Sequence, residues 1–328
     1  MGPIPAWPTT SGRPPGRQSR GREAQLNVVA TAGRPRKSRG AARLQSLLWR
    51  WPWLRTVLLL ALPLAWFVAI YFASLILLLI TSFWTIDTFT TEIVQSWNLD
   101  NFQTILTEPT YRTIIGRTVW MAVRVTLIDA AIAFPFAYFM ARVASRRTQT
   151  LLFAAVLLPL WASYLARLYA WILILNHSGV LNSSLQSIGL PAPNLGYTEN
   201  AMLIVFSYIW LPFMIIPTYA AMERVPESLI EAARDLGARG WRTTLDVVLP
   251  LALPGVVAGS IFTFSLTLGD YITPILIGPG TSFIGNVVYS NLGIANNVPF
   301  AAALSVVPVV IMAVYLLAAR RLGAFEAL

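Results

Sequence analysis

Few residues in this 328-residue chain are charged, and those inside its apolar stretches are the ones whose chemistry needs an explanation. Asp270 and Tyr271 lie in an otherwise apolar stretch, and Pro274 follows shortly after them. A proline at that place is expected to bend a helix and to open its backbone towards a cavity. A carboxylate there can bind an ammonium group, and a tyrosine ring can add a cation–π contact. The alternative is that Asp270 pairs with Arg167 or only breaks the helix.

A second cluster surrounds Arg167, which lies among tryptophan and tyrosine residues. Such rings can line a substrate path, but Trp and Tyr also collect at the membrane–water interface, and that structural interpretation is favoured. If the substrate is a cation, Arg167 is expected to hold a carboxylate in place rather than to touch the substrate. The candidate path residues are Tyr169, Trp171, Asp270 and Tyr271.

Other charged residues favour structural roles. Arg124 and Asp129 lie five residues apart, which at about 100° per residue places them on different faces of a helix. Each is therefore expected to find its partner on a neighbouring helix. His177, the only histidine, lies in a polar connection, so a proton relay or a metal site has little support.

The composition indicates what kind of chain positions these residues. It is 56% hydrophobic and 12% charged, with a mean hydropathy of +0.63, whereas soluble proteins have about 25% charged residues. A helix needs about 20 apolar residues to cross a membrane. We therefore predict an all-α integral membrane protein with about six transmembrane helices. The qualifying stretches are roughly 54–83, 114–141, 150–175, 200–222, 254–278 and 299–319.

The placement of arginines predicts the orientation, because positive charge stays on the cytoplasmic side. Arginines occur in the N-terminal tail, after the second and fourth spans, and at the C-terminus. Arg112 is the only arginine in the connections on the opposite side, which are about 84–113, 176–199 and 279–298. Both termini are therefore expected to be cytoplasmic.

The net charge of +10 is confined to one end of the chain. Residues 1–55 contain eleven Lys and Arg and one acidic residue, while the remainder contains thirteen of each sign. Residues 1–50, rich in Pro, Gly, Ser and Arg, are predicted to form a disordered basic cytoplasmic tail. The charge therefore does not indicate a nucleic-acid partner, and residues 51–328 form the membrane domain.

One connection, residues 223–253, is too polar to span a membrane and yet is patterned like a helix. Pro226 and Glu227 fit a first helical turn, where proline loses no hydrogen bond and an acid meets the positive end of the dipole. Apolar residues follow at helical spacing, and Gly237 can supply a left-handed stop.

A second short helix is expected further along the same connection. Trp241, Leu245 and Val248 have helical spacing, and Pro250 and Pro254 are expected to break the helix after them. The connection is thus predicted to form two short helices at the membrane surface, with an apolar face that needs a partner.

The first of these helices contains the most specific motif in the chain. The segment Glu231-Ala232-Ala233-Arg234-Asp235-Leu236-Gly237-Ala238, followed by Leu249-Pro250 and Pro254-Gly255, closely resembles the EAA loop of binding-protein-dependent ABC permeases. The resemblance implies a coupling helix that docks into a groove on a cytoplasmic ATPase subunit. By resemblance, the residues of that contact are Glu231, Ala232, Ala233, Asp235, Leu236 and Gly237. The alternative is an amphipathic surface helix without a partner.

A wider resemblance covers about residues 54–320. The segments from Trp161 to Trp171, from Leu211 to Phe213 and from Gly269 to Pro274 together resemble the spermidine/putrescine branch of these permeases. The resemblance implies the type I importer architecture, called MetI-like, and a polyamine substrate. Permeases for other small cations, opines, aminophosphonates, amino-acid derivatives and ferric iron share much of this pattern.

The chain itself is not expected to hydrolyse ATP or to hold a cofactor. A phosphate-binding loop needs G-x-x-x-x-G-K-[ST], but Lys37, the only lysine, is preceded by Arg36 instead of glycine. No nucleophile–base pair, no carboxylate dyad in a soluble fold and no nucleotide loop is recognisable. ATP and Mg²⁺ are therefore expected on a separate ATPase subunit.

The family resemblance also implies the partners: a cytoplasmic ABC ATPase dimer, a second and different permease subunit, a periplasmic substrate-binding protein and the lipid bilayer of a bacterial inner membrane. The rival of another class is an ion-coupled secondary transporter. Such transporters often contain inverted repeats with broken helices at matching positions, and no such symmetry is visible here.

Overall fold

The computed structural model describes residues 52–87 and 90–321, most of which are helical. The chain divides into two compact units, Met1–Ala73 and Ser74–Leu328. The tail predicted over residues 1–50 lies outside the described residues.

The first apolar run forms one continuous series of helical turns. α3 (Pro52–Phe67) leads into a π-helical turn, η1 (Val68–Phe72), and α4 (Ala73–Thr81) follows at the start of the larger unit. The segment Leu59–Thr81 has 23 residues, enough to cross a ~30 Å hydrocarbon layer at ~1.5 Å per residue. It agrees with the first predicted span.

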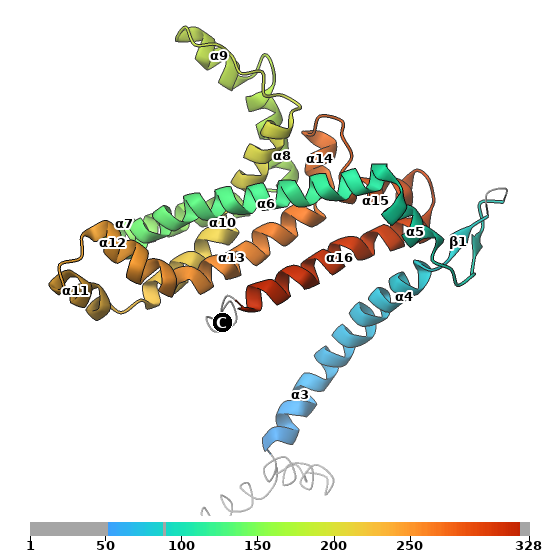
Figure 1. The fold of residues 1–328 in the computed structure, drawn as a ribbon, viewed down its shortest axis with the longest axis horizontal. Helices are drawn as coiled ribbons and strands as arrows, with labels where there is room; N and C mark the ends of the chain where they lie inside the picture. Colours follow the sequence, from blue (N-terminus) through green and yellow to red (C-terminus); the bar gives the residue numbers. More distant parts are fainter. Residues whose placement is uncertain (1–51, 88–89, 322–328) are drawn as a thin grey trace, which may run out of the picture. The chain divides into compact units, whose positions relative to one another are not determined.

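Three long helices form the centre of the larger unit and run alongside one another (Figure 1). They are α6 (Pro109–Tyr138), α10 (Glu199–Arg224) and α13 (Leu249–Gly269). α6 continues through a π-helical turn, η2 (Phe139–Val143). Alanines of α6 and methionines of α10 meet in the buried core between them, together with Ala252 of α13. Small and flexible side chains let the helices approach closely without leaving cavities.

Two glycines explain why α13 lies so close to α10. A Cβ atom on Gly255 would come within 2.3 Å of the Ala221 Cβ and within 2.6 Å of the Pro217 carbonyl oxygen. A Cβ on Gly259 would come within 2.8 Å of the Met214 sulfur. Gly255 and Gly259 lie four residues apart, a spacing of small residues that lets transmembrane helices pack closely, and it does so here for α13 and α10.

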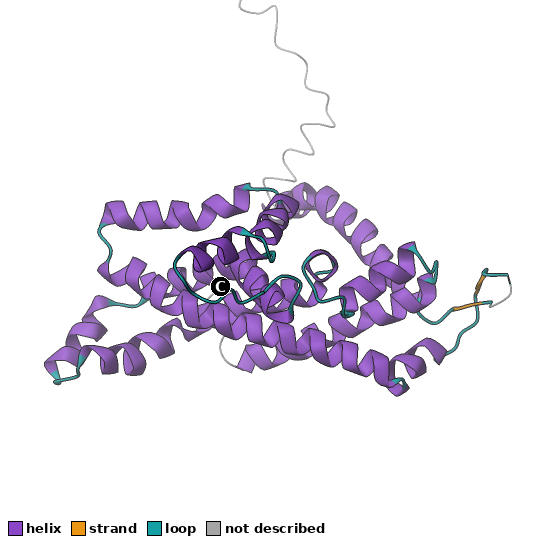
Figure 2. Cartoon of the chain, turned by 90° about the horizontal axis from the view of Figure 1, so that it is seen from above, coloured by secondary structure: helices purple, strands orange, loops and turns teal. Residues whose placement is uncertain are grey.

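The remaining elements cover this centre. α16 (Val298–Arg321) packs against α13, against α15 (Ile284–Gly293) and against α5 (Asp100–Thr107). A short antiparallel hairpin of β1 (Thr85–Ile86) and β2 (Ile93–Val94) pairs Thr85 with Val94. Figure 2 shows these two strands, in orange, at one end of the helices that make up most of the described chain.

The third apolar stretch differs from its prediction. It was expected as one helix over 150–175, but α7 (Arg146–Trp161) ends at an extended pair of residues, Ala162 and Ser163, before α8 (Tyr164–Leu175). The segment Tyr164–Ser187, which includes α9 (Val180–Ser187), turns by 96° from Arg146–Trp161. Pro159 lies in the last turn of α7, where its missing N–H weakens the end of the helix.

The fifth span begins and ends earlier than predicted. α12 (Gly240–Thr243), the π-helical turn η3 (Thr244–Val248) and α13 follow one another as a 30-residue helical run, so Pro250 and Pro254 do not break it. Pro250 lies in the first turn of α13, just after the π-helical turn, where the hydrogen-bond pattern is already altered. The helix stops instead at Gly269, because Asp270 is extended, and α14 (Ile272–Leu276) begins after it.

The span count agrees with the prediction. Among residues 52–87 and 90–321, five helices are long and apolar enough to cross a membrane, or six when the bent pair counts as one span.

Candidate functional site

The short helix α11 (Glu227–Asp235) forms as its sequence predicts. Pro226 precedes it with an extended backbone, and Glu227 occupies the first turn. Gly237 has φ +82°, a conformation that glycine adopts without strain, and its N–H bonds the Arg234 carbonyl at 2.8 Å. The local signals therefore fix both ends of α11.

One face of α11 is buried and the other is open. Ile230 is 5% exposed and packs with Val225 and Val248, and Tyr138 of α6 packs against this cluster. Leu236, just after the helix, is 88% exposed. The residues predicted for the ATPase contact lie on the open side and the following turn, with only Ala233 half-buried: Glu231, Ala232, Ala233, Asp235, Leu236 and Gly237.

A cavity lies beside the break between α13 and α14. Its volume is about 340 Å³, and it is open to one side. Three aromatic side chains, one carboxylate and one hydroxyl contribute to its lining: Tyr164, Trp210, Ser265, Leu266, Gly269, Asp270 and Tyr271. These residues come from α8, α10, α13 and the break itself.

Hydrogen bonds fix the Asp270 carboxylate at the edge of this cavity. Its Oδ1 accepts from the Ile272 N–H at 2.8 Å and from the Thr273 N–H at 3.2 Å. Its Oδ2 accepts from the Thr273 hydroxyl at 2.8 Å and from the Tyr164 hydroxyl. Asp270 thus holds the first turn of α14 and ties it to α8. All four donors are neutral, and among the described residues no cation forms an ion pair with Asp270.

The structure brings together two of the four predicted path residues. Asp270 and Tyr271 line the cavity, and Tyr271 also stacks on Tyr289 with ring centroids 4.9 Å apart. Tyr169 is 56% exposed and does not line the cavity. Trp171 lines a different, small pocket and meets Tyr208 edge-on.

Five lining residues were not among the predicted path residues: Tyr164, Trp210, Ser265, Leu266 and Gly269. Tyr164 and Trp210 stack with ring centroids 6.0 Å apart. Tyr164 belonged to the aromatic cluster around Arg167, and Trp210 directly precedes Leu211-Pro212-Phe213, so a sequence signal existed for both.

Arg167 does not pair with Asp270 in the part of the chain that the structure describes. Its guanidinium lies 5.8 Å from the centroid of the Tyr164 ring. Two of its nitrogens are buried without a hydrogen-bond partner among the described residues, and so is the indole nitrogen of Trp210. Of these two residues only Trp210 lines the cavity, so the unpaired donor beside the cavity is its indole nitrogen.

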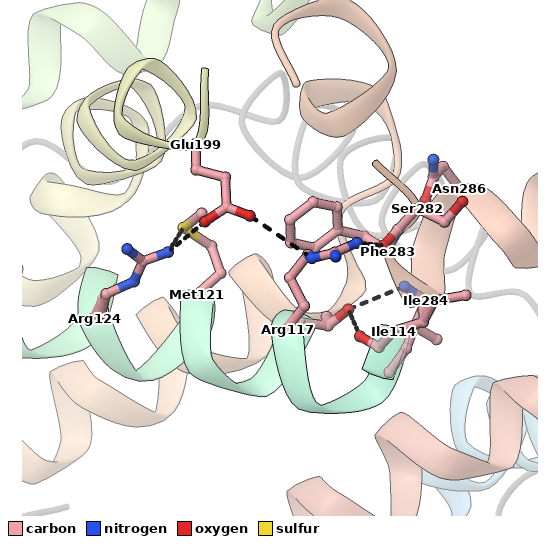
Figure 3. A network of polar contacts seen from close by, with 10 residues as sticks. Ile114, Arg117, Met121, Arg124, Glu199, Ser282, Phe283, Ile284 and Asn286 are labelled. Atoms are coloured by element: carbon pink, nitrogen blue, oxygen red, sulfur yellow. Dashed lines mark hydrogen bonds and ion pairs between the residues drawn. The ribbon is translucent and has the colours of Figure 1, made fainter. Parts of the chain in front are cut away.

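A second polar network joins α6 to the first turn of α10 (Figure 3). Glu199 lies 3.6 Å from Arg117 and 3.5 Å from Arg124, measured between nitrogen and oxygen. Arg117 also donates to the Ser282 carbonyl at 3.3 Å, which connects the network to the segment before α15. The expectation that Arg124 pairs with a neighbouring helix is confirmed.

Asp129, on the same helix, is fully buried and makes no ion pair with any described residue. Its polar neighbour is Ser207 of α10. An ionic partner on a neighbouring helix, which the sequence predicted for Asp129, is therefore not observed in the described ranges.

At the opposite end of α6, Arg142 contacts two other elements. Its guanidinium donates to the carbonyl oxygens of Met222 and Val225, at 2.7 and 2.5 Å. It also pairs with Glu227 of α11 at 2.9 Å. No sequence signal pointed to Arg142 beyond its positive charge.

The model of the family described as binding-protein-dependent transport system inner membrane components matches residues 133–324, more than half of the chain. The chain belongs to this family. The matched region contains α11 and every residue that lines the cavity beside Asp270. This permease is accordingly a multi-pass inner-membrane protein of the MetI-like ABC importer class, and the resemblance to EAA-loop permeases is confirmed. Permeases of this family work with ATPase subunits and substrate-binding proteins.

Curated relatives extend the similarity over nearly the full length. The permease is 46% identical over 316 residues to the inner membrane ABC transporter permease protein YdcU of Escherichia coli, covering 92% of this chain and 99% of that protein. It is 37% identical over 218 residues to the spermidine/putrescine transport system permease protein PotB of Haemophilus influenzae, covering 66% and 76%.

A solved structure has the same fold. A chain from the bacterial alginate ABC transporter, crystallised with an alginate pentasaccharide-bound periplasmic protein, superposes with a TM-score of 0.69 at 20% identity. The match covers 87% of this permease and 98% of that chain. The predicted all-α MetI-like architecture is therefore confirmed.

Proposed function

We propose that this permease imports polyamines such as spermidine and putrescine, and that the cavity beside Asp270 forms part of their path. The observation that carries the proposal is the pairing of an uncancelled carboxylate with aromatic walls in one open cavity. A polyamine carries several ammonium groups on an apolar chain, so it needs negative charge and ring faces in alternation. The similarity to the permease protein PotB supports the same substrate class.

The proposed complex contains two permease chains that differ from each other, an ATPase dimer at the cytoplasmic side and a periplasmic binding protein. α11 docks on the ATPase through its open side, and both permease termini face the cytoplasm. ATP and Mg²⁺ bind to the ATPase subunits, so the permease itself is not catalytic. The exposed position of Glu231 and Leu236 supports this docking.

A small substrate with a carboxylate, such as an amino-acid derivative, is the second candidate. The unpaired indole nitrogen of Trp210, a residue that lines the cavity, favours it, because a buried donor without a partner costs free energy that an acceptor on the substrate would recover. The same importer class holds under both candidates.

The test is ATP-dependent uptake of labelled spermidine, putrescine and a panel of amino-acid derivatives into proteoliposomes that hold the complex and its binding protein. Asp270→Asn is expected to lower polyamine uptake roughly tenfold, equivalent to the loss of about 1.4 kcal/mol. Asp100→Asn, at the exposed start of α5, is the matched control and should leave uptake unchanged.

The outcomes distinguish an error in the proposed substrate from an error in the proposed docking of α11. If the wild type moves no polyamine but its ATPase activity rises with the loaded binding protein, the polyamine substrate is wrong and the importer class stands. Glu231→Ala is expected to abolish uptake while the substrate-binding protein still binds, with Glu92→Ala in the hairpin as its control. Uptake that survives Glu231→Ala would contradict the proposed docking of α11.

A further inference from the structure

The contacts of Arg142 place one guanidinium at the meeting point of three elements. The side chain comes from η2 at the end of α6, and only 13% of it is exposed. It reaches the last turn of α10 through the Met222 carbonyl, the link after α10 through the Val225 carbonyl, and the first turn of α11 through Glu227. These partners lie 80 to 85 residues away in the sequence.

The contact with α10 suits an arginine and fixes both helices. The last carbonyls of a helix have no partner within the helix, and a cation there also meets the negative end of the dipole. A guanidinium offers several donors in a rigid plane, so one nitrogen can bond two carbonyls while another meets a carboxylate. Because the acceptors are backbone atoms, α10 cannot move away from α6 without breaking these bonds.

The contact with α11 adds a third element to this joint. Only Val225 and Pro226 separate α10 from α11, and proline stiffens that link. Glu227 is 58% exposed, yet it points back to Arg142 at 2.9 Å. Ile230, packed with Val225, Val248 and Tyr138, supplies the apolar half of the same attachment.

We propose that Arg142 is a positioning residue that makes α11 and the adjoining ends of α6 and α10 move as one body. A displacement of α11 by the motor then moves the two membrane helices, instead of being absorbed by bending at Val225 and Pro226. This inference rests on the proposed function of α11, but it does not depend on which substrate is carried.

The first experiment measures the number of substrate molecules imported per ATP hydrolysed, in the assembled complex in proteoliposomes. Arg142→Gln is expected to lower this ratio roughly tenfold, within the ~5–150-fold range typical of coupling between sites, while ATP hydrolysis continues. Arg142→Lys should retain part of the ratio, because an ammonium keeps the charge but lacks the planar fork. Glu227→Gln should have a smaller effect than Arg142→Gln. Arg147→Gln, an exposed arginine nearby on α7, is the matched control and should behave as wild type.

A merely structural role for Arg142 predicts a different pattern. Less complex would assemble, and hydrolysis and uptake would fall together at an unchanged ratio, which would overturn the proposal. Glu227→Gln keeps the proposal testable if Arg142→Gln does not fold, because the Glu227 side chain is largely exposed and its change should leave folding intact.

A cross-link that restores the contact is a further test. The chain has no cysteine, so Arg142→Cys and Glu227→Cys can be introduced together and joined by a bismaleimide. The joined variant should regain import per ATP over its unjoined form, and no gain would contradict the proposal.

A second measurement needs no substrate and so separates this inference from the proposed function. Spin labels on Ser228→Cys and Val143→Cys, both at exposed positions outside the proposed ATPase contact, report the distance between α11 and the end of α6. In the wild type the distance distribution should stay narrow when ATP binds. With Arg142→Gln it should broaden. A distribution that stays equally narrow in the variant would overturn the proposal even if polyamines prove to be the substrate.

Discussion

The two ends of the α6–α10 pair are held by arginines of the same helical run in different ways. At one end, Arg117 and Arg124 share the single carboxylate of Glu199, at 3.5 to 3.6 Å. At the other, Arg142 bonds two backbone carbonyls and a carboxylate, all within 2.9 Å.

The difference between these contacts indicates which end of the α6–α10 pair is held more firmly. The Glu199 side chain is 42% exposed and its contacts are long, so water or another charged group can replace them. The Arg142 side chain is 13% exposed and its acceptors belong to the backbone, so its contacts break only when helices move. The end that carries α11 is therefore expected to be the stiff one.

Removal of Arg142 should have the largest effect on stability. Arg142→Ala removes the guanidinium donors from the Met222 and Val225 carbonyls and from Glu227. It should lower the free energy of unfolding in detergent by about 2–4 kcal/mol, since a hydrogen bond to a charged group contributes ~1.5–3 kcal/mol. Denaturant titration followed by circular dichroism measures it, with Arg147→Ala as control. A loss no larger than that of the control would mean that this end is not fixed.

A change between α10 and α13 near the Arg142 end should have an intermediate effect. Gly255→Ala places a Cβ 2.3 Å from the Ala221 Cβ and 2.6 Å from the Pro217 carbonyl oxygen, so the helices must separate. The expected loss is about 1–3 kcal/mol in the same titration.

Gly116→Ala is the matched control for this change. Gly116 lies on α6 near Arg117 and has open space around its Cβ position, so alanine should stabilise the helix by about 0.5–1 kcal/mol. If both substitutions have the same effect, close packing does not distinguish the two ends.

Removal of the Glu199 charge should have the smallest effect. Glu199→Gln breaks two long, half-exposed ion pairs, so the free energy of unfolding should fall by at most about 1 kcal/mol. In the wild type, the contribution of these ion pairs to stability should decrease with added salt. The titration at low and high ionic strength measures it. A loss as large as that of Arg142→Ala would erase the difference between the ends.

Local features of the sequence determined much of this permease. Apolar length gave the span count, and the EAA-like segment identified the family. Pro226 and Gly237 set the two ends of α11, because proline geometry and a left-handed glycine act within one helical turn. Asp270 was a candidate functional residue because a charge in an apolar membrane segment is costly.

Only the tertiary structure decided what those residues contact. The 96° turn after Trp161 was not visible in an apolar stretch long enough for one span. Pro250 and Pro254 signalled a break that did not occur, because a π-helical turn precedes them and neighbouring helices pack along α13.

The partners of the functional side chains lie farther still from them in sequence. Asp270 meets Tyr164 across 106 residues, and Arg142 meets Glu227 across 85. Periodicity and propensity describe the face and ends of a single helix, whereas such pairs depend on how separate helices pack. The sequence by itself therefore determined which residues carry charge within the membrane region, and helix packing determined which of them are fixed by neighbours and which remain exposed.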